Sequence, residues 1–130
     1  KSEPFWMKVA QSVSRGERIV LGTQNALGVL VGTVQLIIDQ PENQPHRADV
    51  AKLLVHPSAR RSGLARELMN ELESCARQQG KTLLVLDTAT GSGAELFYHN
   101  CGWKKVGVIP DYAQMPDGTL TGTTLFYKTL

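Results

Sequence analysis

The stretch "VHPSARRSGLARELM", Val55 to Met69, joins an apolar run directly to an amphipathic pattern. The preceding residues, "ADVAKLLV" (48–55), favour a strand, and from Gly63 to about Gln79 apolar residues recur at helical spacing until Gly80 ends the pattern. The sequence therefore predicts a strand, a short loop and a helix. The predicted apolar face of that helix consists of Leu64, Leu68, Met69, Leu72, Cys75 and Ala76.

The loop itself, "RRSGLA" (60–65), has the features of an anion site. Successive backbone N–H groups lie at the positive end of a helix, and Gly63 and Ala65 are small enough for a bulky anion to approach the main chain. The loop lacks both the Gly-Lys-Ser/Thr ending of a Walker loop and the Gly-x-Gly-x-x-Gly of a dinucleotide fold. The alternative is an ordinary loop in which Arg60 and Arg61 are solvated and Gly63 eases a turn.

The N-terminal part of the chain predicts a helix followed by a hairpin. Phe5, Val9 and Val13 are spaced by four, and Ser2 is a suitable N-cap, so a short helix is expected over 2–15. Two β-rich runs follow between 18 and 39, joined around Asn25 and Ala26; their glycines interrupt any helical period.

The C-terminal part predicts a buried strand at 82–87, a short helix within 91–103, and two strands at 104–109 and 123–128. A turn-rich insert, 111–121, separates the last two strands. These elements predict an α/β (α+β) domain, residues 1–130, with a mixed sheet flanked by helices.

Composition narrows the function classes. Fourteen basic residues against twelve acidic ones give a net charge of only +2, which is too little for a general nucleic-acid surface. No apolar run approaches the length of a membrane span, so no membrane partner is expected. Cys75 and Cys101 are predicted to be free thiols, and this favours a cytoplasmic location.

With its preceding Val-x-Pro, the pattern Arg-x-x-Gly-x-Ala at Arg60, Gly63 and Ala65 resembles the acyl-CoA signature of the GNAT family of N-acetyltransferases. Downstream, "AELFYHNCGW" (94–103) is similar to the second motif of that family. The resemblance implies a mostly antiparallel GNAT sheet with acetyl-CoA as cosubstrate. The family usually has one more strand and helix before the segment like 2–15, so the domain is expected to be N-terminally incomplete, either trimmed or shortened.

The resemblance also implies which residues hold the coenzyme. The loop amides would bind its pyrophosphate, and a bulged strand segment would hold the pantetheine arm and the acetyl carbonyl. Many members carry Asn where this chain has Gly91, so the contact of that side chain is not expected here. The residues assigned to coenzyme binding are Leu53, Leu54, Val55, Arg60, Arg61, Ser62, Gly63, Leu64, Ala65 and Arg66.

Transfer of an acetyl group to an amine requires proton handling. An alkyl amine with a pKa near 10 must lose a proton before it attacks, and Asp49 and Asp87 are the candidate bases. Tyr98 is the candidate acid for the departing thiolate. The alternatives are that Asp87 caps a turn, that Asp49 only attracts the amine, and that Tyr98 is a core residue.

The function expected is transfer of an acetyl group from acetyl-CoA to a primary amine of a small molecule, by direct attack in a ternary complex. Some stretches resemble a family member that acetylates a β-lactam toxin, which points to antibiotic resistance. The alternatives are a non-catalytic acyl-CoA-binding module and a protein or peptide N-acetyltransferase. A homodimer is expected, since dimers are common in the family.

A covalent or metal-dependent reaction is disfavoured. Cys101 has no suitably placed base except His99, and nothing in the sequence indicates that its thiol is activated. His46 and His56 lack partners at ligand spacing, so no metal is predicted.

Overall fold

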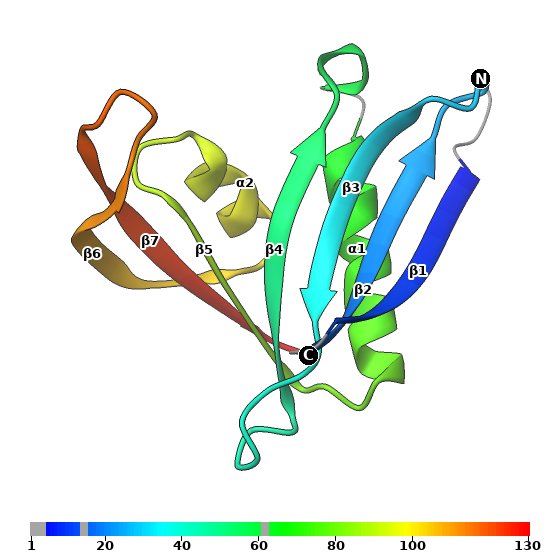
Figure 1. Ribbon diagram of the computed structural model, residues 1–130, viewed down its shortest axis with the longest axis horizontal. Helices are drawn as coiled ribbons and strands as arrows, with labels where there is room; N and C mark the ends of the chain where they lie inside the picture. Colours follow the sequence, from blue (N-terminus) through cyan, green and yellow to red (C-terminus); the bar gives the residue numbers. More distant parts are fainter. Residues whose placement is uncertain (1–4, 14–15, 61–62) are drawn as a thin grey trace.

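The chain folds into a single sheet with helices packed on it, shown as a computed structural model in Figure 1. The structure describes residues 5–13, 16–60 and 63–130. The strands are β1 (Phe5–Val13), β2 (Gly16–Gln24), β3 (Leu30–Ile37), β4 (Arg47–Val55), β5 (Leu83–Ala89), β6 (Lys104–Gln114) and β7 (Leu120–Thr129). The helices are the 3-10 helix η1 (Pro57–Ala59), α1 (Leu64–Gln78) and α2 (Ala94–Asn100).

The sheet is mixed and mostly antiparallel, as predicted. Its strand order is β1-β2-β3-β4-β5-β7-β6. Within the described ranges, β4 and β5 form the one parallel pair, and α1 connects them as a crossover helix.

The helix predicted over 2–15 is wrong, because Phe5–Val13 is strand β1, paired antiparallel with β2. Residues four apart share a face in a strand as well as in a helix, so the spacing of Phe5, Val9 and Val13 fits both structures. Pairing with β2 supplies hydrogen-bond partners for the backbone of both strands, and this tertiary contact decides between them.

The core lies between α1 and the sheet. All six residues predicted for the apolar face of α1 are buried, and Glu73 is buried with them. The helix approaches β3 closely at Gly32, where an added Cβ would lie only 2.7 Å from Cδ1 of Leu68. Burial of Leu64, Leu68 and Leu72 stabilises the fold by about 1.5–3 kcal/mol for each side chain.

The strands β4 and β5 are paired at one end and separate at the other (Figure 1). Pairing joins Arg47–Asp49 to Leu83–Val85, and we call this part the closed end. Beyond Asp49 and Val85 the two strands diverge, and α2 lies behind the gap; we call this part the open end.

A β-bulge in β4 accompanies the divergence. The register of β4 against β3 shifts between Thr33 and Gln35, and Lys52 has a positive φ of 54°. A bulge bends its strand and increases the local twist, which turns the end of β4 away from β5. The family resemblance implied a bulged segment at 53–55, and the observed irregularity, between Ala51 and Leu54, overlaps that range at Leu53.

The C-terminal hairpin is longer than predicted. Strand β6 continues to Gln114 and β7 begins at Leu120, so most of the insert expected at 111–121 is strand. A register irregularity between Ile109 and Ala113, with Asp111 at φ 53°, takes up the start of the predicted insert, and the turn itself covers 115–119. No helix in the described part of the chain is long and apolar enough to span a membrane.

Candidate active site

The loop between β4 and α1 begins at the open end. His56 Nδ1 accepts a hydrogen bond from the amide of Ser58 (3.1 Å), and the Arg60 Nε donates to the carbonyl of Val55 (3.3 Å). Gly63 is the N-cap of α1 with φ 83°, a conformation that favours glycine, and it offers no side-chain acceptor. Gly63 therefore caps none of the first amides of α1 with a side chain, and a helix N-terminus favours an anion.

A cavity of about 340 Å³ lies against this first turn. An added Cβ at Gly63 would meet no atom within 4 Å, so glycine leaves open space there. The lining residues are Val55, Ala59, Arg60, Gly63, Leu64, Ala65, Arg66 and Phe97.

Most of the residues assigned to the coenzyme from the sequence surround this one cavity. Arg61 and Ser62 lie outside the described residues. Leu53 is half-buried against the core, and Leu54, 64% exposed, lines a different pocket. The sequence missed Ala59 and Phe97; Phe97 lies within the second motif, beside Tyr98, and this could have indicated it.

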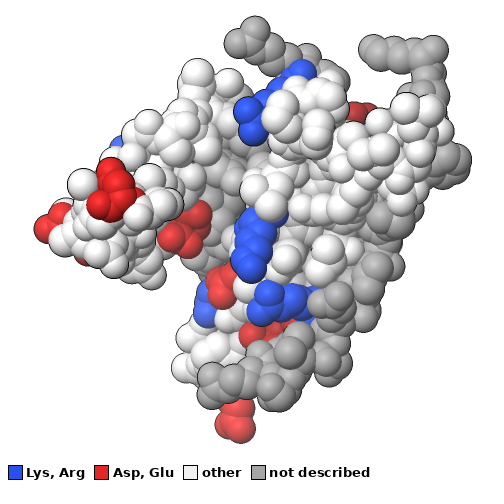
Figure 2. All heavy atoms as spheres, turned by 45° about the horizontal axis from the view of Figure 1, so that its top comes forward, with Lys and Arg blue, Asp and Glu red and all other residues white. Residues whose placement is uncertain are grey.

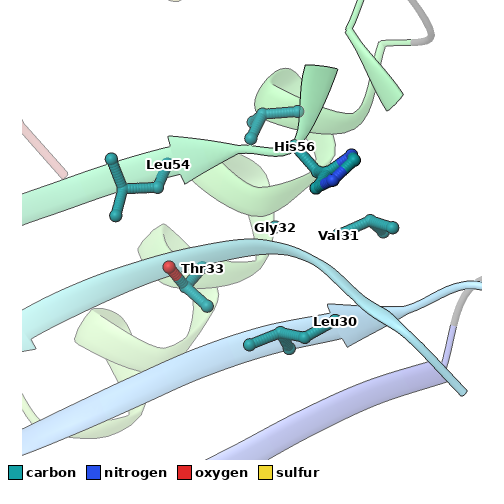
Figure 3. A pocket seen from close by; sticks show the side chains of 7 residues that line it. Leu30, Val31, Gly32, Thr33, Leu54 and His56 are labelled. Carbon is teal, nitrogen blue, oxygen red and sulfur yellow. The ribbon is translucent and has the colours of Figure 1, made fainter. Parts of the chain in front are cut away.

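The second pocket, of about 250 Å³, lies on the β3 side of the end of β4 (Figure 3). It is lined by Leu30, Gly32 and Thr33 from β3. Leu54, near the end of β4, and His56, just after β4, line its other side. Val55 lines both pockets, so the end of β4 separates them.

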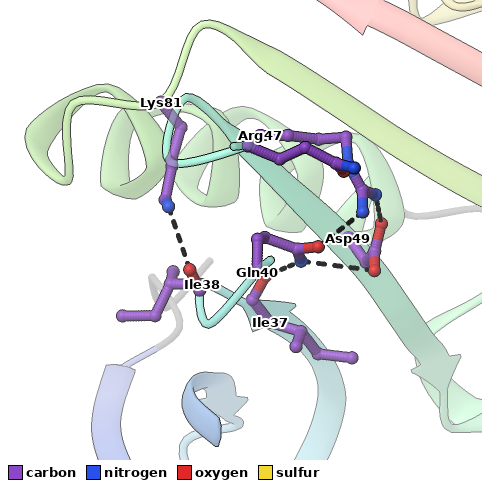
Figure 4. Close-up of polar contacts among 7 residues, drawn as sticks. Ile37, Ile38, Gln40, Arg47, Asp49 and Lys81 are labelled. Carbon is purple, nitrogen blue, oxygen red and sulfur yellow. Dashed lines mark hydrogen bonds and ion pairs between the residues drawn. The ribbon is translucent and has the colours of Figure 1, made fainter. Parts of the chain in front are cut away.

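Asp49 lies at the closed end, at the last position paired with β5. Its carboxylate pairs with the Arg47 guanidinium and accepts a hydrogen bond from Gln40 Nε2 (3.3 Å), while Arg47 also donates to Gln40 Oε1 (2.6 Å) (Figure 4). A base in this position would have to exchange a proton while it is held by an arginine.

Asp87 lies on β5 beyond Val85, the last residue paired with β4, and is exposed. Its Oδ2 accepts a hydrogen bond of 2.7 Å from Oγ1 of Thr123 on β7, a buried threonine whose hydroxyl also lies 3.2 Å from the carbonyl of Thr88. Because side chains alternate between the two faces along a strand, Asp49 and Asp87 lie on the same face of the sheet. Ideal strand spacings put their Cα atoms at least about 8 Å apart. The structure therefore gives the two carboxylates different surroundings.

Tyr98 lies on α2, at the back of the open end. Its ring packs against Phe97, Trp103 and Phe126, with centroid distances of 5.3, 6.1 and 5.7 Å. Burial raises the pKa of its hydroxyl, and the neighbouring Cys101 contributes in the same direction. Tyr98 is thus both a core residue, 7% exposed, and a phenol that stays protonated at neutral pH.

The β5–α2 loop is fixed by Glu95 at the start of α2. Its carboxylate accepts hydrogen bonds from the amide of Gly91 (3.2 Å) and from the hydroxyl of Thr124 (3.2 Å). The Gly91 amide is the main cause of a lowered Glu95 pKa; desolvation, the next largest effect, opposes it, and Thr124 and Lys105 lower the pKa further. A carboxylate thus holds this loop at the position where many family members carry Asn.

The cysteines and histidines form no second centre in the described part of the chain. Cys75 and Cys101 are free, and burial raises the pKa of the Cys101 thiol. A thiol with a raised pKa is a poor nucleophile at neutral pH. The described residues contain no cluster of three or more His, Cys, Asp or Glu that could hold a metal.

Figure 2 turns the top of Figure 1, where the strands diverge, towards the viewer. The surface is hollowed there between its two halves, and charged side chains stand singly or in small groups of either sign. A cavity at the start of a helix, a bulged strand and a diverging parallel pair together define a cleft between β4 and β5.

The sequence of this chain matches the acetyltransferase (GNAT) family over residues 3–103. Because this match covers more than half of the chain, the chain belongs to that family, whose members are acyltransferases. Human N-acetyltransferase 8 is 32% identical over 104 residues, covering 79% of this chain. The chain spans 39% of the length of that curated relative.

Solved structures share the fold. One is a ribosomal-protein-alanine N-acetyltransferase from Brucella melitensis, with 24% identity, a TM-score of 0.76, and coverage of 87% of this chain and 69% of that one. Another is an aminoglycoside 6'-N-acetyltransferase in complex with coenzyme A, with 21% identity, a TM-score of 0.72, and coverage of 86% and 72%. Proteins with this fold therefore act on both small molecules and proteins.

Proposed function

We propose that this chain transfers an acetyl group from acetyl-CoA to a primary amine of a small molecule, by direct attack in a ternary complex. The observation that carries the proposal is the divergence of β4 and β5 beside the cavity at the start of α1. A family member with an open cleft at this place has room for a thioester between the strands.

The coenzyme fits the residues present. Gly63, Ala65 and the first amides of α1 would hold its pyrophosphate, and Arg60 and Arg66 would add positive charge at the rim of the cavity. When bound, acetyl-CoA supplies an activated acetyl group and a thiolate leaving group.

The amide of Val55 is the best candidate to stabilise the acetyl oxyanion. The His56 amide donates to the carbonyl of Val31 on β3 (2.7 Å). Because successive N–H groups of a strand point to opposite edges, the Leu54 amide also points towards β3 and the Val55 amide points towards the cleft. This geometry therefore favours the Val55 amide over the Leu54 amide.

Asp87 is the stronger of the two candidate bases. Its carboxylate lies beyond the closed end and accepts a hydrogen bond from Thr123, whereas Asp49 is paired with Arg47. In the proposed reaction Asp87 takes the proton of the attacking amine, directly or through a water. The Tyr98 hydroxyl then gives its proton to the leaving thiolate and regains one from solvent.

The acceptor is proposed from a resemblance. The stretches "HRADVAKLLV" (46–55), "LDTATGS" (86–92) and "YKTL" (127–130) resemble the tabtoxin resistance protein, which acetylates the amine of a β-lactam toxin. A β-lactam amine is therefore the first acceptor to test, with a role in antibiotic resistance as its consequence.

We also propose a cellular compartment and an oligomeric state for the protein. The free thiols Cys75 and Cys101 support a reducing compartment such as the cytoplasm. A homodimer is proposed because dimers are common in the family, and light scattering of the purified protein would measure its mass.

The test is release of free thiol from acetyl-CoA in the presence of different amines: tabtoxinine-β-lactam, amino acids, polyamines, aminoglycosides and peptides. We expect one strongly preferred small amine. Preference for peptides would replace the small-molecule acceptor with a protein. Coenzyme binding measured by calorimetry without release for any amine would favour a binding module.

A further inference from the structure

The C-terminal end of α2 is closed by an arrangement that leaves two carbonyls for side chains. The amide of Trp103 donates to the carbonyl of Tyr98, and the amide of Gly102 to that of His99, both at 3.0 Å, with Gly102 at φ 89°. This is a Schellman motif, which satisfies the carbonyls one turn back from the end. The carbonyls of Asn100 and Cys101 remain outside it.

Each of those two carbonyls accepts a hydrogen bond from a cationic side chain of another element. Nη2 of Arg66, in the first turn of α1, donates to the carbonyl of Asn100 (3.1 Å). Nζ of Lys128, on β7, donates to the carbonyl of Cys101 (2.7 Å). Positive charge is favourable at this negative end of the helix dipole. The two cations also connect the end of α2 to α1 and to β7.

Lys128 is itself held by a buried acid. Its Nζ lies 3.0 and 3.1 Å from the two carboxylate oxygens of Glu73, in the middle of α1, and Glu73 is only 5% exposed. Arg77 lies farther from this carboxylate, at 4.0 Å, and is largely exposed. Lys128 therefore joins α1, β7 and the end of α2 at one point.

These contacts surround the turn that carries Tyr98. Its carbonyl is part of the Schellman motif, and its ring packs on Trp103, the residue that closes the motif, and on Phe126, two residues before Lys128. A shift of the end of α2 would thus move the Tyr98 hydroxyl relative to the cleft.

We propose that Lys128, held by Glu73, is a positioning residue for acetyl transfer, fixing the last turn of α2 so that the Tyr98 hydroxyl faces the thioester sulfur. The inference rests on the proposed function for its catalytic consequence. Arg66, which lines the cavity at the start of α1, holds the same end of α2 through the carbonyl of Asn100. Occupancy of that cavity and the position of Tyr98 are therefore coupled through α1.

The experiment has a readout that does not need turnover. The chain has three tyrosines, Tyr98, Tyr112 and Tyr127, so the variant with Tyr112→Phe and Tyr127→Phe reports on Tyr98 alone by absorbance titration. In this background we expect Lys128→Met to lower the pKa of Tyr98 towards its ordinary value, because the loosened turn admits water. An unchanged titration would overturn the proposal.

Turnover gives the second readout. With the preferred amine, Lys128→Met should lower kcat about tenfold or more, since small displacements of a reacting group are costly, while the affinity for coenzyme A stays within about twofold. Lys128→Arg, which keeps the charge and the donors, should recover most of kcat. Equal losses of kcat and coenzyme affinity would contradict positioning of Tyr98.

Two further variants separate positioning from stability. Lys128→Met with Glu73→Leu removes both partners of the buried pair and should restore much of the stability lost in the single variant without restoring kcat. Lys81→Met is the matched control, since Lys81 also donates to two backbone carbonyls, those of Ile38 and Pro45, but at the closed end. It should change neither the Tyr98 titration nor kcat.

Failure of the two proposals can be told apart. If the unmodified protein releases no thiol with any amine, the proposed function fails, and the titration still decides whether Lys128 fixes Tyr98. If thiol is released but Lys128→Met and the unmodified protein have equal kcat and equal Tyr98 titrations, only the positioning role is lost.

Discussion

The two ends of the β4–β5 pair use similar side chains for opposite purposes. At the closed end, Lys81 and Arg47 bind the β3–β4 connection to the sheet, and the Asp49 carboxylate is held by Arg47 and Gln40 (Figure 4). At the open end, Asp87 is exposed, and its carboxylate accepts a hydrogen bond from Thr123. The comparison shows how one strand pair can be anchored at one end and leave a cleft at the other.

The largest expected effect distinguishes the two ends of α1. Gly63 and Gly80 both have positive φ, 83° and 76°, and at neither would a Cβ meet an atom within 4 Å. Gly63→Val should lower the affinity for coenzyme A at least about 100-fold, because the side chain enters the space where the pyrophosphate would approach the main chain. Isothermal calorimetry measures the affinity.

Gly80→Val is the control for that substitution. It carries the same left-handed strain, about 1–2 kcal/mol, at the closed end of the molecule. We expect a lower melting temperature with unchanged coenzyme affinity. If the two variants bind coenzyme equally well, the cavity at Gly63 is not the pyrophosphate site.

The next effect compares the two carboxylates. Asp87→Asn should lower kcat/KM about 100-fold at pH 7, and the deficit should shrink as pH rises towards the pKa of the amine, because solvent then removes the proton. Asp49→Asn should cost less than about threefold at every pH. A reversed order in the pH–rate profiles would make Asp49 the base.

Tyr98 should produce a smaller loss and a characteristic pH dependence. A thiolate is a good leaving group, so Tyr98→Phe should lower kcat only about tenfold, near or below the low end for general acid catalysis. Because burial raises its pKa, the protonated acid persists above the usual value near 10, and activity should fall only at higher pH. Stopped-flow pH jumps would show this limb, which should vanish in Tyr98→Phe.

The smallest effect on catalysis is expected at the closed end. Lys81 is buried and donates 2.9 and 2.8 Å hydrogen bonds to the carbonyls of Ile38 and Pro45. Lys81→Met leaves both carbonyls without this donor and should destabilise the fold by about 2–3 kcal/mol in urea unfolding. A change of kcat/KM beyond about twofold would mean that the closed end does not merely anchor the cleft.

Sequence reasoning succeeded where the pattern had one structural solution. The helix from Gly63 to Gln79 has apolar residues at three and four apart over four turns, which no strand could bury on one face. It failed at 2–15, where residues four apart fit both structures, and it made the insert at 111–121 too long, since only 115–119 is a turn between the two strands.

The residues of the candidate site also differ in how far the sequence alone could predict them. The motif predicted Val55, Arg60 and the residues from Gly63 to Arg66, which line one cavity, because a loop and the helix after it form a local structure. Phe97 was missed because α2 reaches the cavity through packing of elements separated along the chain. The difference between Asp49 and Asp87 could not be predicted either, since it depends on Arg47, Gln40 and Thr123.

The sequence by itself determined the class of the fold and the family, and it predicts the place of the anion loop, because amphipathic period, glycine positions and motif spacing act over short distances along the chain. Only the tertiary structure decided that β1 is a strand, where β4 and β5 diverge, and that Lys128 meets Glu73 and the end of α2. Strand partners and buried ion pairs are chosen by residues distant in sequence, and their energies exist only once the chain has folded.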